Sequence, residues 1–267
     1  MNIFNVFGRG EPIASKVSVV VLGHQKSGTT AIAALLALAS EATYANDPLY
    51  EIDKGAAKAA ENMLSTPGML GRLIQKHRAL FDSVVVKDPD LIFAWPDCST
   101  CFPNARFVFI VRDPRDNIRS ICNRLNLPGK RSTKIPPPES MDRPNAHWTK
   151  VISGELPLIT STAAGGDYIA NLAHRWNLAS QIFLENRDAM TLVRYEDFKR
   201  NKLGVLNNLA DEVGLNMTRD VSDSLSKPFQ PKGNSDISWS EFYSPDALRT
   251  IEEICAPLMS EFDYAPT

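Results

Sequence analysis

The sequence predicts an α/β fold, a three-layer sandwich in which helices cover both faces of a central parallel sheet. Short apolar runs alternate with helical stretches, and these runs are almost continuously hydrophobic, as strands buried on both faces are. The chain has 267 residues, 43% of them hydrophobic, which is enough for one domain with a large core. We therefore expect a single domain over residues 1–267.

The order of the expected elements follows from hydrophobic periodicity. Strands are predicted at residues 17–23, 83–87, 106–111 and 190–194. Helices are predicted at residues 28–40, 54–64, 68–81, 114–124, 168–186, 201–213 and 245–260. Proline- and glycine-rich turns interrupt the alternation at about residues 125–166, and so long a segment without regular structure is typical of a lid. We expect a lid-like insertion there.

The segment GHQKSGTT, residues 23–30, joins the first strand to the first helix. Backbone N–H groups converge in such a turn, and the helix dipole adds positive charge, so the segment predicts a phosphate site. The residues predicted to hold the phosphate are Gly23, Gln25, Lys26, Ser27, Gly28, Thr29 and Thr30. A nucleotide-hydrolysing P-loop has lysine directly after its second glycine, where this chain has Thr29. The fold expected is thus of the P-loop-containing nucleotide-binding type, with the lysine displaced.

A second informative segment begins where the strand at residues 106–111 ends. Arg112 follows this strand, and Ser120 lies about two turns into the next helix. Arginine recognises phosphate with two parallel hydrogen bonds, and a serine hydroxyl adds a donor. Taken alone, Arg112 next to Asp113 also fits a structural ion pair. Beside the loop of Lys26, the segment predicts a second phosphate site.

Together these segments resemble the sulfotransferases that use 3′-phosphoadenosine 5′-phosphosulfate (PAPS). In that family the lysine-bearing loop binds the 5′-phosphosulfate, and a motif R-x-P-x-D-x-x-x-S binds the 3′-phosphate. Arg112, Pro114, Asp116 and Ser120 match this motif term by term. The resemblance implies PAPS as the cofactor, PAP as its product and no metal.

Two weaker matches follow in the expected order. Tyr195 begins a segment similar to the family's Y-E-D-[LMF], whose tyrosine lies against the adenine. Lys232 and Gly233, followed by Trp239, resemble the late K-G…W segment that closes over the 3′-phosphate. Pro231 precedes Lys232 where the cytosolic enzymes have arginine, which leaves one phosphate ligand fewer.

A larger departure concerns the catalytic base. Cytosolic small-molecule sulfotransferases carry K-x-H with a histidine base, and here Pro89 stands two residues after Lys87. The K-x-P form is more similar to the bacterial, carbohydrate and tyrosylprotein branches, which draw a carboxylate base from the region after the first helix. The candidate bases are Asp47 first, Glu51 second and Asp53 third, although each also fits a solvated loop carboxylate. His147, in the predicted insertion, is a further candidate.

Sulfuryl transfer resembles phosphoryl transfer and depends on positioning and charge stabilisation. We expect Lys26 to neutralise the bridging oxygen and Lys87 to steady the sulfuryl oxygens. The predicted reaction moves a sulfuryl group from PAPS to a hydroxyl, with an amine as the second candidate, of a small-molecule or saccharide acceptor. One alternative is a P-loop small-molecule kinase or other NTP-binding enzyme, which the displaced lysine disfavours. Another is a non-catalytic nucleotide-binding protein on a degenerate sulfotransferase fold, for which Pro89 and Pro231 leave room.

The composition of the chain indicates which kinds of binding partner and which location to expect. The net charge of −2 and the pI of about 6.1 disfavour nucleic acid. No apolar run reaches the roughly 18 residues needed to span a bilayer, and no secretory signal is evident at the N-terminus. The four cysteines are interpreted as reduced thiols, and Cys98-x-x-Cys101 lacks further ligands for a metal. A cytoplasmic location is expected, and a homodimer is compatible with the sequence.

Overall fold

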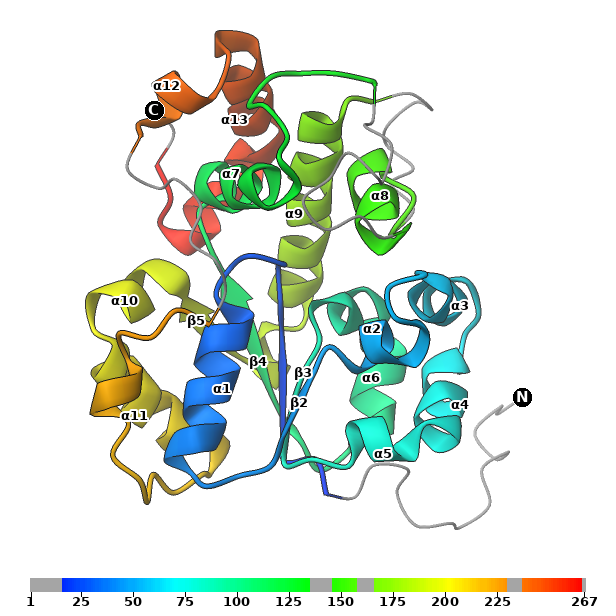
Figure 1. Cartoon of the computed structure of the whole chain (residues 1–267), viewed down its shortest axis with the longest axis vertical. Coiled ribbons are helices and arrows are strands. Elements are labelled where there is room, and N and C mark those ends of the chain that lie inside the picture. The colour runs from blue at the N-terminus through cyan, green and yellow to red at the C-terminus, as the bar shows by residue number, and fades with distance from the viewer. Residues whose placement is uncertain (1–15, 135–145, 158–165, 230–236, 266–267) are drawn as a thin grey trace.

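A computed structural model describes residues 16–134, 146–157, 166–229 and 237–265. Its centre is a five-stranded parallel sheet with helices on both sides (Figure 1). The strands are β1 (Val19–Gly23), β2 (Tyr44–Asn46), β3 (Val85–Lys87), β4 (Arg106–Val111) and β5 (Met190–Arg194), in the spatial order β2-β3-β1-β4-β5. The predicted three-layer α/β fold is confirmed.

Side chains alternate between two hydrophobic cores, one on each face of the sheet. Val20 and Leu22 of β1 belong to one core, and Val19 and Val21 belong to the other. The helices over the second core are α1 (Thr29–Ala39), α10 (Tyr195–Arg200) and α11 (Lys202–Val213). The helices over the first core include α3 (Lys58–Ser65), α4 (Met69–Lys76), α6 (Trp95–Cys101), α7 (Pro114–Leu125), α9 (Tyr168–Glu185) and α13 (Pro245–Met259).

The smaller elements complete the chain. They are the helices α2 (Pro48–Asp53), α5 (Arg78–Phe81), α8 (Ala146–Ser153) and α12 (Trp239–Phe242), and the 3₁₀ helices η1 (Pro89–Ala94), η3 (Arg187–Ala189), η4 (Ser222–Ser224) and η5 (Ser260–Phe262). The helix expected at residues 68–81 is divided at His77 into α4 and α5. Inside the predicted insertion, α8 forms a regular helix, while residues 135–145 and 158–165 lie outside the described residues. The insertion as a lid, like the single domain, stays a prediction.

Chain connectivity creates one crevice of particular interest. The chain leaves β1 toward β2 and β3 on one side and later returns to β4 on the other side of β1. Ligands of open α/β sheets bind at such a reversal, outside the carboxyl ends of the strands. Gly23 ends β1 opposite Ile110 of β4, so the loop after β1 and Arg112 after β4 meet at this point. The topology therefore brings the two predicted phosphate segments together.

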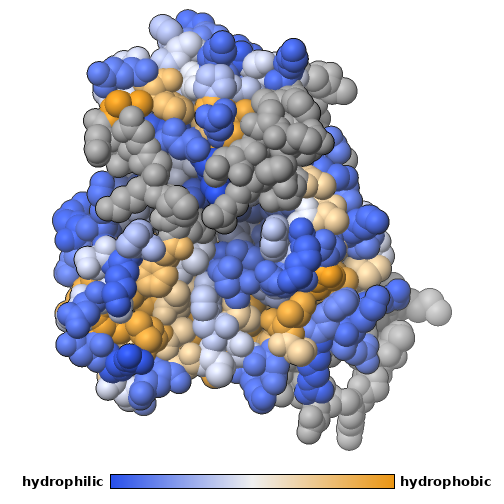
Figure 2. Space-filling model, in the orientation of Figure 1, coloured by the Kyte–Doolittle hydropathy of each residue, from blue (hydrophilic) through white to orange (hydrophobic). Residues whose placement is uncertain are grey.

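The surface is mostly hydrophilic on the face shown in Figure 2, with hydrophobic residues in separate groups. Within the described ranges, none of the helices has the length and apolar character needed to cross a membrane.

Candidate active site

The loop after β1 depends on two glycines for its shape. A Cβ atom on Gly23 would lie 2.3 Å from the carbonyl oxygen of Ile110, so only glycine lets the loop start against β4. Gly28 has φ +87° at the N-cap of α1, and a Cβ there would lie 2.4 Å from Cδ2 of Tyr195. Lys26 adopts a φ of +67°, which non-glycine residues rarely take. The loop is therefore a strained, closely packed turn at the N-terminus of α1.

A cavity of about 330 Å³ opens beside this loop. The predicted residues that line it are Lys26, Gly28, Thr29, Thr30, Arg112, Ser120 and Tyr195. The lining residues that the sequence did not single out include Arg119, Asn123, Phe198, Lys199, Lys202, Lys227 and Phe229. The structure thus joins the two predicted phosphate segments and the predicted adenine-facing tyrosine in one cavity.

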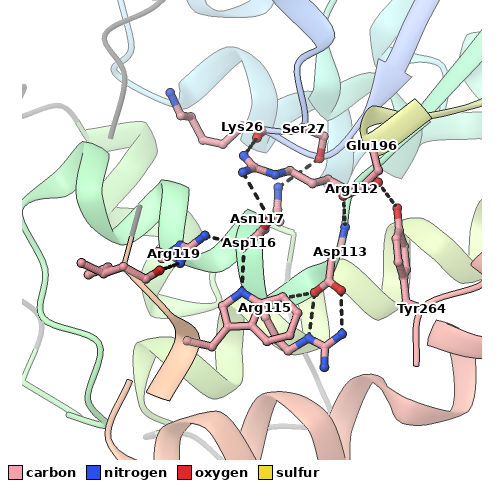
Figure 3. Close-up of polar contacts among 12 residues, drawn as sticks. Lys26, Ser27, Arg112, Asp113, Arg115, Asp116, Asn117, Arg119, Glu196 and Tyr264 are labelled. Carbon is pink, nitrogen blue, oxygen red and sulfur yellow. Dashed lines mark hydrogen bonds and ion pairs between the residues drawn. The ribbon is translucent and has the colours of Figure 1, made fainter. Parts of the chain in front are cut away.

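Arg112 lies between the two segments (Figure 3). Its Nη1 donates to the carbonyl oxygen of Lys26 at 3.0 Å, and its Cζ lies 4.7 Å from the centre of the Tyr195 ring. Its Nη2 lies 3.7 Å from a carboxylate oxygen of Asp116. Its Nε is buried and has no hydrogen-bond partner among the described residues. A buried cationic donor without a partner fits an anionic ligand at this position.

Asn117 of α7 ties the two segments together. Its Nδ2 donates to the carbonyl oxygen of Gln25 at 2.7 Å and to Oγ of Ser27 at 3.0 Å. The Ser27 hydroxyl is fully buried and lies outside the cavity lining, so within the described structure it serves the loop itself. Gly23 likewise shapes the loop without lining the cavity.

Asp113 pairs with Arg115 and not with Arg112. Its two carboxylate oxygens accept from Nε and Nη2 of Arg115 at 2.9 and 2.6 Å. Trp239 stacks under the Arg115 guanidinium at 3.9 Å, and its Nε1 donates to Asp116 at 2.8 Å. The late segment therefore reaches the R-x-P-x-D helix through its tryptophan, while Lys232 and Gly233 lie outside the described residues.

Tyr195 is held in place through its neighbour Glu196. One carboxylate oxygen of Glu196 accepts from the backbone N–H of Asp113 at 3.1 Å, and the other accepts from the Tyr264 hydroxyl at 2.7 Å. The segment after β5 forms α10, which the sequence did not predict. The short helix brings Tyr195 against Gly28 on one side and Arg112 on the other.

The predicted catalytic pair lies at the end of β3. Lys87 is 2% exposed, and its Nζ donates to Oδ1 of Asp47 at 2.7 Å. Lys87 is in register with Val21 of β1, so this pair lies at the same sheet edge as the loop of Lys26, beside the donor cavity, whose lining includes neither side chain. Asp47 precedes α2, and about a third of its side chain is exposed.

The other candidate carboxylates have different partners. Glu51 pairs with Lys54, a contact in which both side chains are well exposed. Asp53 accepts from the backbone N–H groups of Gly55 and Ala59 at 3.2 and 2.8 Å, and so closes the turn between α2 and α3. Of the three, Asp47 is the one that contacts Lys87. Helix α2, which the sequence did not predict, is what separates these carboxylates.

A buried polar cluster lies on the other side of the loop. The side chain of Gln25 is absent from the cavity lining and donates to Asp90 at 2.7 Å, and His147 lies 2.6 Å from the same carboxylate. His24 stacks on Trp176 with ring centres 5.5 Å apart. Burial, together with the charge of Arg175, lowers the pKa of His24 to about 3, so this histidine is neutral at physiological pH. No group of three or more metal-binding side chains occurs in the part of the chain that the structure describes.

Comparisons with known proteins bear on the family and the fold. A family model described as "Sulfotransferase family" matches residues 53–219, more than half of the chain. Comparison with curated protein sequences found no match. A sulfotransferase from Alicyclobacillus acidocaldarius is similar in structure, with a TM-score of 0.53, 13% identity and coverage of 93% of this chain and 96% of that one. A sulfotransferase from Mycobacterium avium has a TM-score of 0.54 at 14% identity, over 94% and 78% of the two chains. The chain belongs to the sulfotransferase family.

Proposed function

We propose that the protein transfers a sulfuryl group from PAPS to a hydroxyl group of a small-molecule or saccharide acceptor, with an amine as the second candidate acceptor group. The observation that carries this proposal is the composition of the cavity. Lys26 with the start of α1 forms one anion site, Arg112 with Ser120 forms a second, and Tyr195 lies in the same lining. PAPS carries a 5′-phosphosulfate, a 3′-phosphate and an adenine ring on one ribose, which is the combination this lining fits.

The unpartnered Nε of Arg112 supports a 3′-phosphate ligand. Arg112 is held by the Lys26 carbonyl and the Tyr195 ring, so its guanidinium is oriented before a ligand arrives. Pre-organised donors lose little entropy on binding and therefore contribute more affinity. Ser120 of α7 adds a hydroxyl donor in the same cavity lining. We infer that Lys232 and Gly233 complete this site, as the family resemblance implies.

Lys26 and Lys87 have the charges that the transfer requires. As the bond between sulfur and the bridging oxygen breaks, negative charge grows on that oxygen, and the Lys26 ammonium is proposed to neutralise it. Lys87 has three N–H donors, so it can hold Asp47 and a sulfuryl oxygen at the same time. The new bond joins the acceptor oxygen to sulfur.

Asp47 is proposed to take the proton of the acceptor hydroxyl. Its contact with Lys87 places it next to the cation proposed to bind the sulfuryl oxygens. Its partial exposure leaves room for an acceptor to approach. A positioned base typically contributes about 10²–10⁴-fold to the rate. Glu51 remains the second candidate.

Binding of radiolabelled PAPS to the purified protein tests the proposal. We expect saturable binding that excess PAP displaces, followed by transfer of label to one or more members of a panel of phenols, sterols and saccharides. A folded protein that binds no PAPS contradicts the proposal. Intact binding without transfer to any acceptor favours the non-catalytic alternative.

Magnesium-dependent ATP turnover is the matched assay for the kinase alternative. The carboxylate that follows β3, Asp88, is 2% exposed and accepts from the backbone N–H groups of Leu49 and Asp90 at 3.0 and 3.1 Å. Both of its oxygens are engaged by the backbone, so it is poorly placed to serve a magnesium–nucleotide complex. We therefore expect no ATP turnover.

A further inference from the structure

The cluster around Asp90 joins three segments of the chain. Asp90 lies in η1 and is 4% exposed. Its Oδ1 accepts from Nε2 of Gln25 at 2.7 Å and from Nη2 of Arg175 at 2.6 Å, and its Oδ2 lies 2.6 Å from Nε2 of His147. Gln25 belongs to the donor-binding loop (residues 24–28), Arg175 to α9 and His147 to α8. None of these side chains lines the donor cavity.

Both ends of the Gln25 side-chain amide are held by this cluster. Its amide oxygen accepts from Nη2 and Nε of Arg175 at 2.9 and 3.3 Å, while its amide nitrogen donates to Asp90. Its backbone oxygen accepts from Asn117. The next residue, Lys26, adopts a φ of +67° that its neighbours must maintain. The conformation of the donor-binding loop therefore depends on the anchoring of Gln25.

Helix α8 is anchored by the same side chains. At its first turn, His147 contacts Asp90, and the backbone N–H of His147 donates to the carbonyl oxygen of Gly55 at 3.0 Å. Beyond its last turn, Nη1 of Arg175 donates to the carbonyl oxygen of Leu156. Arg175 thus contacts the segment after α8, Asp90 and Gln25 at once. Asp90 and Arg175 therefore hold both α8 and the donor-binding loop.

Charge strengthens the contact between His147 and Asp90. Burial alone would lower the pKa of His147, but the Asp90 carboxylate outweighs burial and the pKa is raised; Arg175 opposes this shift and Asp88 supports it. Burial would raise the pKa of Asp90, yet His147, Arg175 and the hydrogen bond from Gln25 hold it below its usual range. One carboxylate thus faces the Arg175 guanidinium and the His147 imidazole in a buried site.

We propose that His147 and Asp90 form a positioning pair that couples the docking of helix α8 to the conformation of the donor-binding loop, with Gln25 as the connecting residue. Neither His147 nor Asp90 lines the donor cavity, so they act on the donor through the loop. The effect on donor affinity rests on the proposed function, whereas the coupling between α8 and the loop does not.

Hydrogen exchange followed by mass spectrometry tests the coupling from both ends. Gln25→Leu changes the loop, and we expect amide exchange in α8 to quicken roughly threefold to tenfold. His147→Gln changes α8, and we expect faster exchange in the donor-binding loop and a loss of PAP affinity of roughly threefold to tenfold. Lys150→Gln is the matched control, because Lys150 lies on α8 and pairs with Glu61 but does not contact Asp90.

The pH dependence of amide exchange in α8 distinguishes the proposed role of His147 from simple packing, because packing alone would not change with pH. A histidine whose pKa is raised by folding contributes its stabilisation below about pH 6.5, and this contribution is lost as pH rises through the folded-state value. After correction for intrinsic exchange, opening of α8 should therefore become easier with rising pH in the wild type. His147→Gln should reduce this dependence to the part that Asp88 contributes, and Lys150→Gln should keep it in full.

Each outcome decides the proposal. The proposal is overturned if amide exchange in α8 is unchanged in Gln25→Leu. It is also overturned if Lys150→Gln and His147→Gln speed amide exchange in the donor-binding loop equally. If the wild type binds no PAP, the proposed function fails, and exchange in Gln25→Leu and His147→Gln still decides whether α8 and the loop are coupled.

Discussion

Gly28→Ala is the substitution whose effect the structure defines most closely. Gly28 caps the N-terminus of α1 with φ +87°, a conformation that costs an alanine roughly 1–2 kcal/mol. The added Cβ would also lie 2.4 Å from Cδ2 and 2.6 Å from Cε2 of Tyr195, so the ring must move. The substitution therefore combines a cost in the backbone with a steric clash in the donor cavity.

The clash is expected to reduce donor affinity because the Tyr195 ring packs against the Arg112 guanidinium and helps to position it. The guanidinium lies 4.7 Å from the ring centre, a contact worth roughly 0.5–2 kcal/mol, and a misplaced Arg112 weakens a charge-assisted hydrogen bond worth about 1.5–3 kcal/mol. Loss of the hydrogen bond alone, about 1.5–3 kcal/mol, corresponds to roughly a 10- to 150-fold weaker affinity for PAP. Isothermal titration with PAP measures this loss, and urea unfolding measures the stability.

Gly68→Ala is the matched control. Gly68 caps the N-terminus of α4 with φ +75°, and a Cβ there would meet no atom within 4 Å. We expect Gly68→Ala to cost the same backbone energy and to leave PAP affinity unchanged. If the two variants lose equal stability and bind PAP equally well, the steric role of Gly28 against Tyr195 is refuted.

Four further predictions address the catalytic groups and pH. Lys26→Ala should lower the rate of sulfuryl transfer at least 10²-fold without unfolding the protein, as transfer assays and circular dichroism will show. Asp47→Asn should lower turnover by about 10²–10⁴-fold while PAP affinity in titrations stays unchanged. Arg112→Gln should weaken the binding of PAP much more than that of adenosine 5′-phosphate, because the substitution removes a 3′-phosphate ligand. Burial, together with the charges of Asp47 and Asp90, raises the pKa of Asp88 to about 8. The free energy of unfolding should therefore fall by about 2 kcal/mol between pH 6 and 8. In Asp88→Asn it should fall by less.

The outcomes that contradict these predictions are distinct. Near-normal turnover in Asp47→Asn excludes this base and directs attention to Glu51. Equal losses for PAP and adenosine 5′-phosphate in Arg112→Gln would place this arginine away from the 3′-phosphate. The free energy of unfolding is expected to fall because the fold favours the protonated form of Asp88. This stabilisation diminishes as pH rises toward the folded-state pKa of about 8. A stability that rises over this range would show that the carboxylate is favoured as an anion.

The fold was predictable where hydrophobic pattern determines structure. The runs at β1 and β4 are buried on both faces, and nearly continuous apolar sequence is sufficient to identify such strands. β2 has only three residues and is partly exposed, so Tyr44–Asn46 carries no apolar run to recognise. Helix α10 follows directly from β5 at Arg194, and its length of six residues is too short for a helical period to show.

The site was predictable in its donor half, because short motifs fix the backbone there. Lys26, Gly28, Arg112, Ser120 and Tyr195 were named from sequence and line one cavity. The remaining partners depend on long-range packing. The contact between His147 and Asp90 spans 57 residues, and that between Arg175 and Gln25 spans 150. Nothing in the local sequence around these residues indicates such partners.

The Gln25 side chain shows the same limit, because the loop motif does not indicate which residues that side chain contacts. It contacts Asp90 and Arg175. Asn117 shows the converse, because a residue within the second motif anchors the backbone of the first.

Comparing the affinities of PAP and adenosine 5′-phosphate for the wild-type protein tests the central claim most directly. Both ligands share the adenine, the ribose and the 5′-phosphate, and only PAP carries the 3′-phosphate proposed to meet Arg112 and Ser120. Two charge-assisted hydrogen bonds at about 1.5–3 kcal/mol each predict that PAP binds at least about 100-fold more tightly, with one molecule per chain. Equal affinities, or no binding of PAP to the folded protein, would contradict the assignment of this cavity to PAPS.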